Sequence, residues 1–143
     1  VAFGAFSAKI EPAADEMLVG LAPELIGKNN KIEIRGHATN EPLPMSSPFK
    51  DAIDLGFARA RAVRDRLVDL GVDPRTVRVA SAGYYEPILN QTYNDGRRAA
   101  NRRVEIVITQ ALRADYTPPP PSAREIAAEA ESGAKTASPP NPR

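Results

Sequence analysis

Residues 31–36 read Lys-Ile-Glu-Ile-Arg-Gly, a stretch in which two isoleucines alternate with a glutamate and an arginine. This period of two is typical of a β-strand with one buried and one exposed face. The next residues, Gly-His-Ala-Thr at 36–39, leave the strand. Residues 40–50 then hold three prolines and two serines, which favours an exposed loop over regular structure.

Two amphipathic helices are predicted on either side of this strand along the chain. Residues 12–26 carry apolar side chains at helical spacing, although Pro23 predicts a kink or an early end. Residues 55–70 repeat the helical pattern and stop at a glycine. Asp51 or Asp54 is the candidate N-cap of this second helix.

Residues 1–6 are predicted to form a strand or the end of one, and further strands are predicted at 77–82 and 103–109, with a loop over 83–97. Strands separated by helices give a βαβαββ-like order. This order predicts an α/β (α+β) sandwich, in which a mixed sheet carries its helices on one face.

The 143 residues leave room for about one ordinary domain. Half of the 14 prolines fall in residues 117–143, a segment with too little apolar surface to offset the entropy of folding. We therefore expect a domain over 1–116, followed by a disordered Pro/Ala-rich tail over 117–143.

Composition excludes several kinds of site. The chain has no Cys and one His, which removes disulfides, thiolate zinc sites and any site that needs two imidazoles. A net charge of +1 gives no overall attraction to nucleic acid, and no apolar run reaches the roughly 20 residues that span a bilayer. Without a paired catalytic acid and base or a phosphate-binding glycine pattern, we expect no enzyme activity, metal or cofactor. The chain starts at Val1, so we also expect a fragment or a processed product.

Arg59 occupies an unexpected place on the helix predicted over 55–70. At about 100° per residue, it falls within the apolar arc that Leu55, Val63 and Leu67 define. A guanidinium directed toward the sheet needs a carboxylate, a carbonyl or an anionic ligand to offset its desolvation. Helix geometry alone favours an internal ion pair, or a side chain that reaches past the helix end, over a ligand-binding role.

Four arginines lie within residues 97–103, around Asn101. Their mutual repulsion makes this cluster a candidate site for a carboxylate or a phosphate, with neighbouring acidic residues as the alternative partners. We expect Arg103 to pair with Glu105 on the same strand. His37, at the end of its strand, is either a structural residue or lies beside a ligand.

Several elements combine in a recognisable order: Ile32-Glu33-Ile34-Arg35-Gly36-His37, Leu55-x-x-Ala58-Arg59-Ala60-x-x-Val63, Gly83 with Pro87, and Arg98-x-x-Asn101-Arg102-Arg103-Val104-Glu105-Ile106. Their order and spacing resemble the OmpA/MotB C-terminal domain over residues 1–110. The resemblance implies a non-catalytic module of the periplasm. Such a module holds the peptidoglycan cell wall by gripping the diaminopimelate of its stem peptide.

The resemblance also implies roles for single residues. Arg59 is expected to bind a ligand carboxylate, and Asn101 and Arg102 to line or support the same pocket. His37 is expected at the edge of that pocket. The candidate ligand-binding residues are Arg59, Thr39, Asn40, His37, Asn101, Arg102, Leu55, Asp51, Asp54 and Arg98.

This chain departs from the family pattern at two positions. The family usually reads Gly-His-Thr-Asp, with the Asp receiving the ligand ammonium, whereas this chain has Thr39 at that place. A hydroxyl provides no charge, and the loss of a charge-assisted bond costs on the order of 1 to 3 kcal/mol. Ala52 replaces the usual Asn. We expect Asp51 or Asp54, delivered by the proline-rich loop, to take over the ammonium.

Within the family, loop 42–49 and the run 54–63 are most similar to flagellar-motor MotB-type proteins. This likeness implies a stator anchor that works as a dimer and is tethered to the inner or outer membrane by a segment before Val1. The tail of an outer-membrane porin and a peptidoglycan-associated lipoprotein are alternatives. Thr39 and Ala52 also leave open a degenerate domain that serves as a protein-interaction module.

Overall fold

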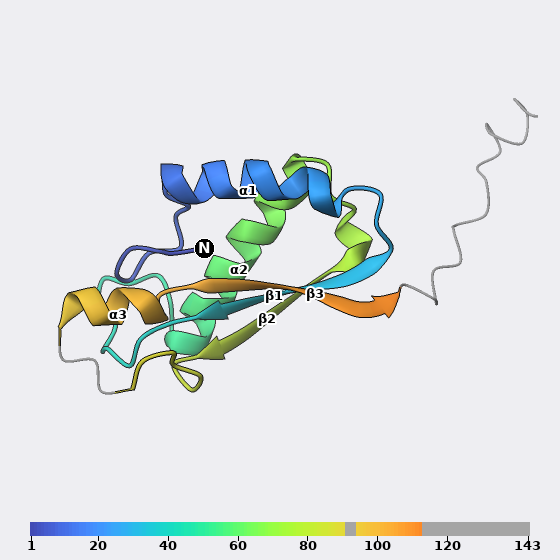
Figure 1. Ribbon diagram of the computed structural model, residues 1–143. Coiled ribbons are helices and arrows are strands. Elements are labelled where there is room, and N and C mark those ends of the chain that lie inside the picture. Colours follow the sequence, from blue (N-terminus) through green and yellow to red (C-terminus); the bar gives the residue numbers. More distant parts are fainter. Residues whose placement is uncertain (91–93, 113–143) are drawn as a thin grey trace, which may run out of the picture.

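The computed structural model describes residues 1–90 and 94–112, which form a sheet with helices around it (Figure 1). In chain order the elements are α1 (Pro12–Leu25), β1 (Asn30–His37), α2 (Ala52–Asp69), the 3-10 helix η1 (Pro74–Thr76), β2 (Val77–Gly83), α3 (Asp95–Asn101) and β3 (Val104–Leu112). The domain boundary predicted at 116 and the tail predicted over 117–143 lie outside the described residues.

The described strands form a mixed sheet, as predicted, and their order in the sheet is β2-β1-β3. The central strand β1 runs parallel to β2, with Ile34 opposite Val79. It runs antiparallel to β3, where Ile34 lies opposite Ile106. The parallel pair needs a crossover connection, and α2 lies in that connection.

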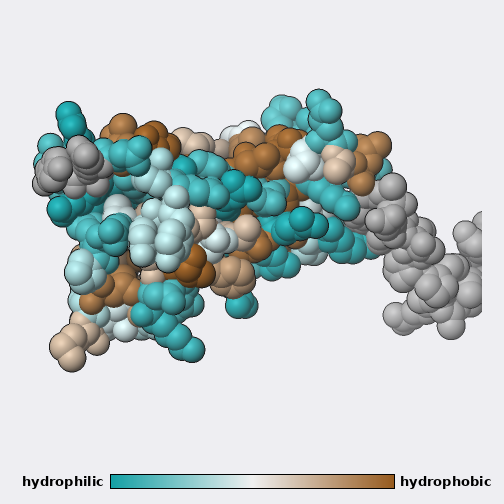
Figure 2. All heavy atoms as spheres, turned by 90° about the horizontal axis from the view of Figure 1, so that it is seen from below, coloured by the Kyte–Doolittle hydropathy of each residue, from teal (hydrophilic) through white to brown (hydrophobic). Residues whose placement is uncertain are grey.

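The core lies between the sheet and the helices α1 and α2. Ile32 and Ile34 of β1 are 2% and 0% exposed, and they belong to one buried cluster with Leu18 of α1 and with Val63 and Leu67 of α2. The isoleucine alternation in the sequence therefore marks the face of β1 that the helices cover. Seen from below, the apolar surface outside this core is divided into separate areas among hydrophilic residues (Figure 2).

Strand β1 and helix α2 approach each other at two glycines, Gly36 and Gly56. A Cβ placed on Gly36 would overlap the Gly56 carbonyl, lying 2.6 Å from its carbon atom. The Ser81 hydroxyl of β2 also donates to the Ile53 carbonyl at 2.7 Å. These contacts fix the first turn of α2 against the ends of β1 and β2, where the chain leaves the sheet.

The strand predicted over 1–6 is reduced to an isolated bridge between Ala2 and Arg103. The chain turns at Phe6, which has a φ of 52°, in the left-handed region that L-residues rarely adopt. An extended strand cannot continue through that conformation. The predicted strand at the N-terminus is therefore wrong beyond this single bridge.

The loop predicted over 83–97 is also wrong in its last residues, because α3 begins at Asp95. Asn94 caps this helix by accepting a hydrogen bond from the Arg97 amide at 2.9 Å. With seven residues, α3 is too short to display a helical period in the sequence.

The bounds of the long helices differ slightly from the prediction. Helix α1 runs through Pro23 and ends at Leu25. Helix α2 begins at Ala52, earlier than predicted, with Asp51 as its N-cap. Within the described residues, no helix has both the length and the hydrophobicity to cross a bilayer.

Candidate functional site

Two adjoining pockets lie where β1 ends and the chain turns toward α2. One, which we call the Asn101 pocket, has a volume of about 210 Å³ and is lined by Ala38, Thr39, Asn40, Tyr84, Pro87, Leu89, Asn90 and Asn101. The other, the Asp51 pocket, has a volume of about 390 Å³ and is lined by Asn40, Glu41, Pro42, Leu43, Lys50, Asp51, Ala52 and Tyr84. Asn40 and Tyr84 belong to both linings, so the two pockets meet at these residues.

Glu41 is a pocket residue that the sequence analysis did not select. Its Oε2 accepts a hydrogen bond from the Thr39 hydroxyl at 2.5 Å, and its Oε1 accepts one from Arg98 Nη1 at 2.9 Å. Arg102 Nη1 lies 4.0 Å from Oε2. The carboxylate therefore brings together three of the predicted site residues. The sequence signal that could have indicated it is an acidic side chain two residues after Thr39, where the chain leaves the sheet.

Asn101 holds one wall of the pocket that we named after it. Its Oδ1 accepts hydrogen bonds from the backbone amides of Ile88 and Leu89 at 2.9 and 3.1 Å, and its Nδ2 donates to the Leu89 carbonyl at 3.0 Å. The neighbouring Arg102 is 6% exposed and donates to Asp95 Oδ1 at 2.8 Å. Asn101 thus lines the pocket, whereas Arg102 lines neither pocket and lies near the site through Glu41.

Arg59 is fully buried, as its place in the apolar arc of the helix predicts. Its guanidinium donates to the backbone carbonyls of Ser7, His37 and Gly4 at 2.8, 2.9 and 2.8 Å. Its carbon atom Cζ also lies 5.5 Å from the centre of the Phe3 ring. Burial, and after it the positive charge of Arg102, lowers the pKa of this guanidinium to about 10.

These contacts show which groups offset the desolvation of the Arg59 guanidinium. Among the described residues, no carboxylate forms a salt bridge with Arg59, so the internal ion pair is absent and backbone carbonyls serve instead. Arg59 lines neither pocket. It ties the N-terminal segment to the end of β1 at His37, the residue before the pocket residue Ala38.

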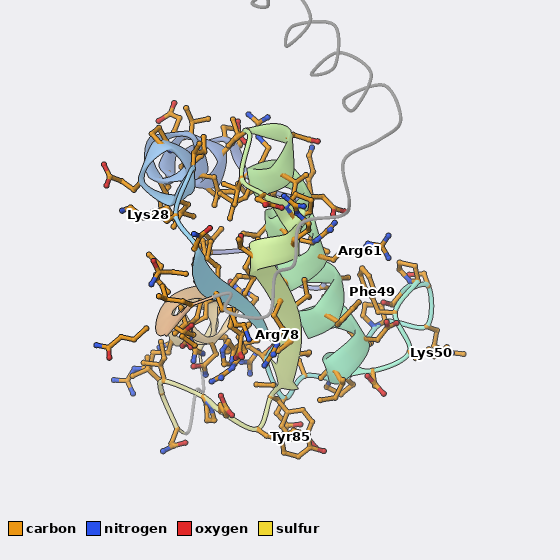
Figure 3. The ribbon with its side chains drawn as sticks, turned by 90° about the vertical axis from the view of Figure 1, so that its right-hand side faces the viewer. Lys28, Phe49, Lys50, Arg61, Arg78 and Tyr85 are labelled. Atoms are coloured by element: carbon orange, nitrogen blue, oxygen red, sulfur yellow. The ribbon has the colours of Figure 1, made fainter. Side chains whose placement is uncertain are left out.

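The first turn of α2 contains the other predicted carboxylates. Asp51 Oδ1 accepts from the Asp54 amide at 2.8 Å, and Asp54 Oδ2 accepts from the Lys50 amide at 3.0 Å. Asp51 therefore caps α2, and Asp54 fixes the backbone of the residue before that cap. Asp51 also lines its pocket, with Lys50 beside it on the loop before α2 (Figure 3). Asp54 lines neither pocket, and Leu55 is a core residue at 3% exposure.

The ring of His37 lies away from the pockets, on the face of the sheet opposite the isoleucines of β1. It is 1% exposed, and its Nε2 lies 3.5 Å from Glu105 Oε2. Burial, and then the charge of Arg103, lowers the pKa of His37 below its ordinary value, so the ring is neutral near pH 7. Arg103 pairs with Glu105 as predicted, with 2.6 Å between Nη2 and Oε1.

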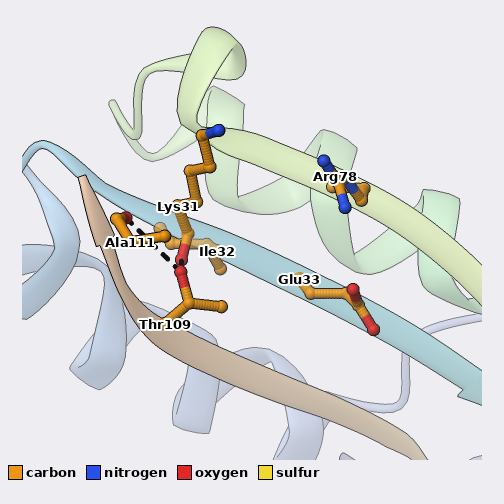
Figure 4. A pocket seen from close by; sticks show the side chains of 6 residues that line it. All are labelled: Lys31, Ile32, Glu33, Arg78, Thr109 and Ala111. Atoms are coloured by element: carbon orange, nitrogen blue, oxygen red, sulfur yellow. Dashed lines mark hydrogen bonds between the residues drawn. The ribbon is translucent and has the colours of Figure 1, made fainter. Parts of the chain in front are cut away.

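Another pocket, of about 220 Å³, lies on the outer face of the sheet (Figure 4). Its lining consists of Lys31, Ile32, Glu33, Arg78, Thr109 and Ala111. The Thr109 hydroxyl already donates to the Lys31 carbonyl at 2.9 Å. None of the predicted site residues lines this pocket, so we place the candidate site at the end of β1.

The candidate site carries both signs of charge. Glu41 and Asp51 supply carboxylates, and Lys50 and Arg98 supply cations. Such an arrangement suits a ligand that has an ammonium and a carboxylate of its own, because each can form a charge-assisted hydrogen bond. Within residues 1–90 and 94–112, no group of three or more potential metal ligands comes together.

Comparison with known proteins gives one family match. The sequence matches the model of the OmpA family over residues 2–102, a range that includes every predicted site residue. No curated protein matches the chain.

Solved structures show the same fold. The C-terminal domain of MotB from Helicobacter pylori is 23% identical with a TM-score of 0.71, over 95% of this chain and 96% of that one. The peptidoglycan-associated lipoprotein from Burkholderia pseudomallei is 25% identical with a TM-score of 0.67, over 76% and 88% of the two chains. A MotB-like protein from Desulfovibrio vulgaris is 26% identical with a TM-score of 0.65, over 74% and 68%.

Proposed function

Because the chain belongs to the OmpA family, we propose that the pockets at the end of β1 bind the stem peptide of peptidoglycan and so anchor a cell-envelope protein to the cell wall. Domains of this family are non-catalytic peptidoglycan-binding modules of the periplasm. The observation that carries the proposal is the family match itself, which spans every residue that lines the two pockets.

The charges around the pockets favour diaminopimelate as the residue that is gripped. The side chain of diaminopimelate ends in an ammonium and a carboxylate, so its site needs an acidic and a basic partner. Glu41 and Asp51 offer the acidic partners, and Lys50 and Arg98 the basic ones. A simple anion or an uncharged sugar would use only part of this set.

We assign the ligand ammonium to Glu41, with Asp51 as the second carboxylate. Thr39 offers a hydroxyl without charge, and this hydroxyl already donates to Glu41. The family pattern has a carboxylate at the position of Thr39. In this chain Glu41, two residues further along, supplies it instead. Asp54 is a weaker candidate than Asp51, because it caps the Lys50 amide and lines neither pocket.

We propose that Arg59 assists binding from behind the pocket. Its positive charge has no carboxylate partner among the described residues, so it adds to a positive potential around Ala38 that attracts a ligand carboxylate. Direct contact would require the Gly4 or Ser7 carbonyl to move away from the guanidinium. Arg98 donates to the pocket residue Glu41 at 2.9 Å, so its positive charge also lies beside the pockets.

For the parent protein we propose a MotB-type flagellar stator subunit that works as a dimer and is attached to a membrane. The proline-rich loop before α2 and the likeness to the MotB domain of H. pylori support this choice. An outer-membrane porin or a peptidoglycan-associated lipoprotein is the alternative, supported by the comparable likeness to the lipoprotein from B. pseudomallei.

A second candidate function is a protein-interaction module that has lost wall binding. It is favoured by Thr39 and Ala52, which stand where the family usually has Asp and Asn. The two functions differ in one measurable property, because only a wall anchor is retained by purified peptidoglycan.

The test is a pull-down of the full chain on purified diaminopimelate-type peptidoglycan, with free diaminopimelate as competitor. We expect retention that the competitor reverses, and at least a tenfold loss of affinity in Glu41→Gln. Glu33→Gln is the matched control, because Glu33 is also paired with an arginine, 2.6 Å from Arg35 Nη2, but lies away from both pockets. No retention of the folded wild-type chain would favour the protein-interaction module.

A further inference from the structure

We propose that Tyr84 and Tyr85 form a stacking platform for a sugar ring of the glycan strand, beside the pockets that take the stem peptide. This inference rests on the proposed function and adds a second part of the ligand to it. The two rings are stacked with 4.4 Å between their centres and 25° between their planes. They follow β2 directly and project from that end of the sheet, where Figure 3 shows Tyr85.

The position of the pair relative to the pockets is the first argument. Tyr84 lines both the Asn101 pocket and the Asp51 pocket, so a ligand that fills both passes its ring. Tyr85 lines neither, and it is 69% exposed against 36% for Tyr84. The platform therefore continues the pocket surface outward, toward whatever is attached to the bound peptide.

The backbone holds this exposed pair in place. Gly83 has a φ of 56°, and the Tyr85 amide donates to the Ala82 carbonyl at 3.1 Å, which closes a tight turn. A Cβ on Gly83 would lie 2.7 Å from the Ile53 Cδ1 atom, so the turn also packs closely on the start of α2. Two large rings are thus presented to solvent at a fixed turn next to a binding site.

The chemistry of the ligand supplies the second argument. A peptidoglycan stem is attached to a sugar of the glycan strand through its first residue, and diaminopimelate is its third. Three extended residues span about 10 Å, so the sugar lies on the order of 10 to 15 Å from a diaminopimelate side chain held in the pockets once its link to the peptide is included. One face of a pyranose ring is lined by C–H groups, which pack on the face of an aromatic ring, and the tyrosine hydroxyl can bond to sugar hydroxyls.

The protonation state of the pair suits this role. A side-chain hydrogen bond with Tyr85 raises the pKa of the Tyr84 phenol above its ordinary value. Tyr84 is therefore uncharged at physiological pH. A neutral aromatic surface beside the charged pocket rim divides the site into a part for the peptide and a part for the sugar.

The experiment compares two ligands by calorimetry on the full chain. One is the stem tripeptide that ends in diaminopimelate, and the other is the same tripeptide attached to its muramyl sugar. We expect the sugar-bearing ligand to bind roughly fivefold tighter to the wild-type chain. Tyr85→Ala should remove this difference and leave the affinity for the bare tripeptide unchanged, whereas Tyr85→Phe should keep most of it.

Phe57→Ala is the matched control, because Phe57 is a 43% exposed aromatic residue on α2 that lines neither pocket. Equal affinity of the wild type for both ligands would overturn the platform and leave the proposed function standing. The same holds if Tyr85→Ala weakens both ligands equally. If the folded wild type binds neither ligand, the proposed function fails and the platform fails with it.

Discussion

Replacing Arg59 by alanine should lower the free energy of unfolding by about 3 kcal/mol. The guanidinium makes hydrogen bonds of 2.8, 2.9 and 2.8 Å to three backbone carbonyls. Net losses of about 1.5 kcal/mol for each bond to a charged group would give roughly 4.5 kcal/mol. Part of that loss is recovered, because the variant no longer buries a charge and because water can reach the carbonyls of the half-buried Gly4 and Ser7.

Urea unfolding followed by circular dichroism measures this change directly. For a domain of this size, a loss of about 3 kcal/mol lowers Tm by roughly 15 °C. Arg61→Ala is the control on the same helix, because the Arg61 side chain is 69% exposed and lies 3.7 Å from Asp65. Such an exposed pair contributes less than about 0.5 kcal/mol. Arg59→Lys should fall between the two, since an ammonium keeps the charge but cannot reach three separated carbonyls.

A loss of less than about 1 kcal/mol in Arg59→Ala would refute the reasoning, because the three bonds would then contribute little to the fold. The result also decides how binding data are interpreted. If Arg59 ties the N-terminal segment to β1, a loss of wall binding in Arg59→Ala reflects a damaged fold as much as a lost ligand contact. Variants at the pocket rim are then the sharper probes of binding.

Three further predictions concern the fold and its pH dependence. Gly36→Ala should abolish soluble folded protein, because its Cβ would overlap the backbone of α2, whereas Gly20→Ala, with open space on α1, should raise stability by about 0.5 kcal/mol in the same urea assay. His37 should titrate below pH 6.5 in an NMR experiment, where its signal is assigned at once because the chain has one histidine. The unfolded state then binds the proton more readily than the folded state, so the free energy of unfolding falls as pH drops through 6.5. A midpoint above 6.5 would contradict its burial as a neutral ring. Asn101→Ala should cost about 2 kcal/mol and accelerate hydrogen exchange at residues 88–89, and unchanged exchange there would show that other contacts hold that wall.

The central part of the fold could be predicted from the sequence because its signals are repeated along the chain. Ile32 and Ile34 mark the buried face of β1, and the helical spacing in residues 55–70 marks α2. The short α3 carries too few residues for such a period. The predicted strand over 1–6 failed because its backbone turns at Phe6, and nothing in an apolar run records a positive φ.

The candidate site could be predicted only in part, for a different reason. The need of Arg59 for a partner follows from its place among apolar residues, but backbone carbonyls are present at every position, so no sequence pattern identifies the ones that it bonds. Glu41 was not selected because its contact with Arg98 depends on the path of the loop. Contacts across 57 positions of the chain have no local signature.

The most direct test of the proposed site is an NMR titration of the isotope-labelled full chain with the diaminopimelate stem tripeptide. If the ligand occupies the pockets at the end of β1, saturable shift changes should concentrate at Thr39, Asn40, Glu41 and Asn101. The chemical shifts of the amides around Lys31 and Arg78, on the outer face of the sheet, should not change. Saturable changes confined to the outer face, or no changes at millimolar ligand with the fold intact, would contradict the assignment of this site to the peptidoglycan stem.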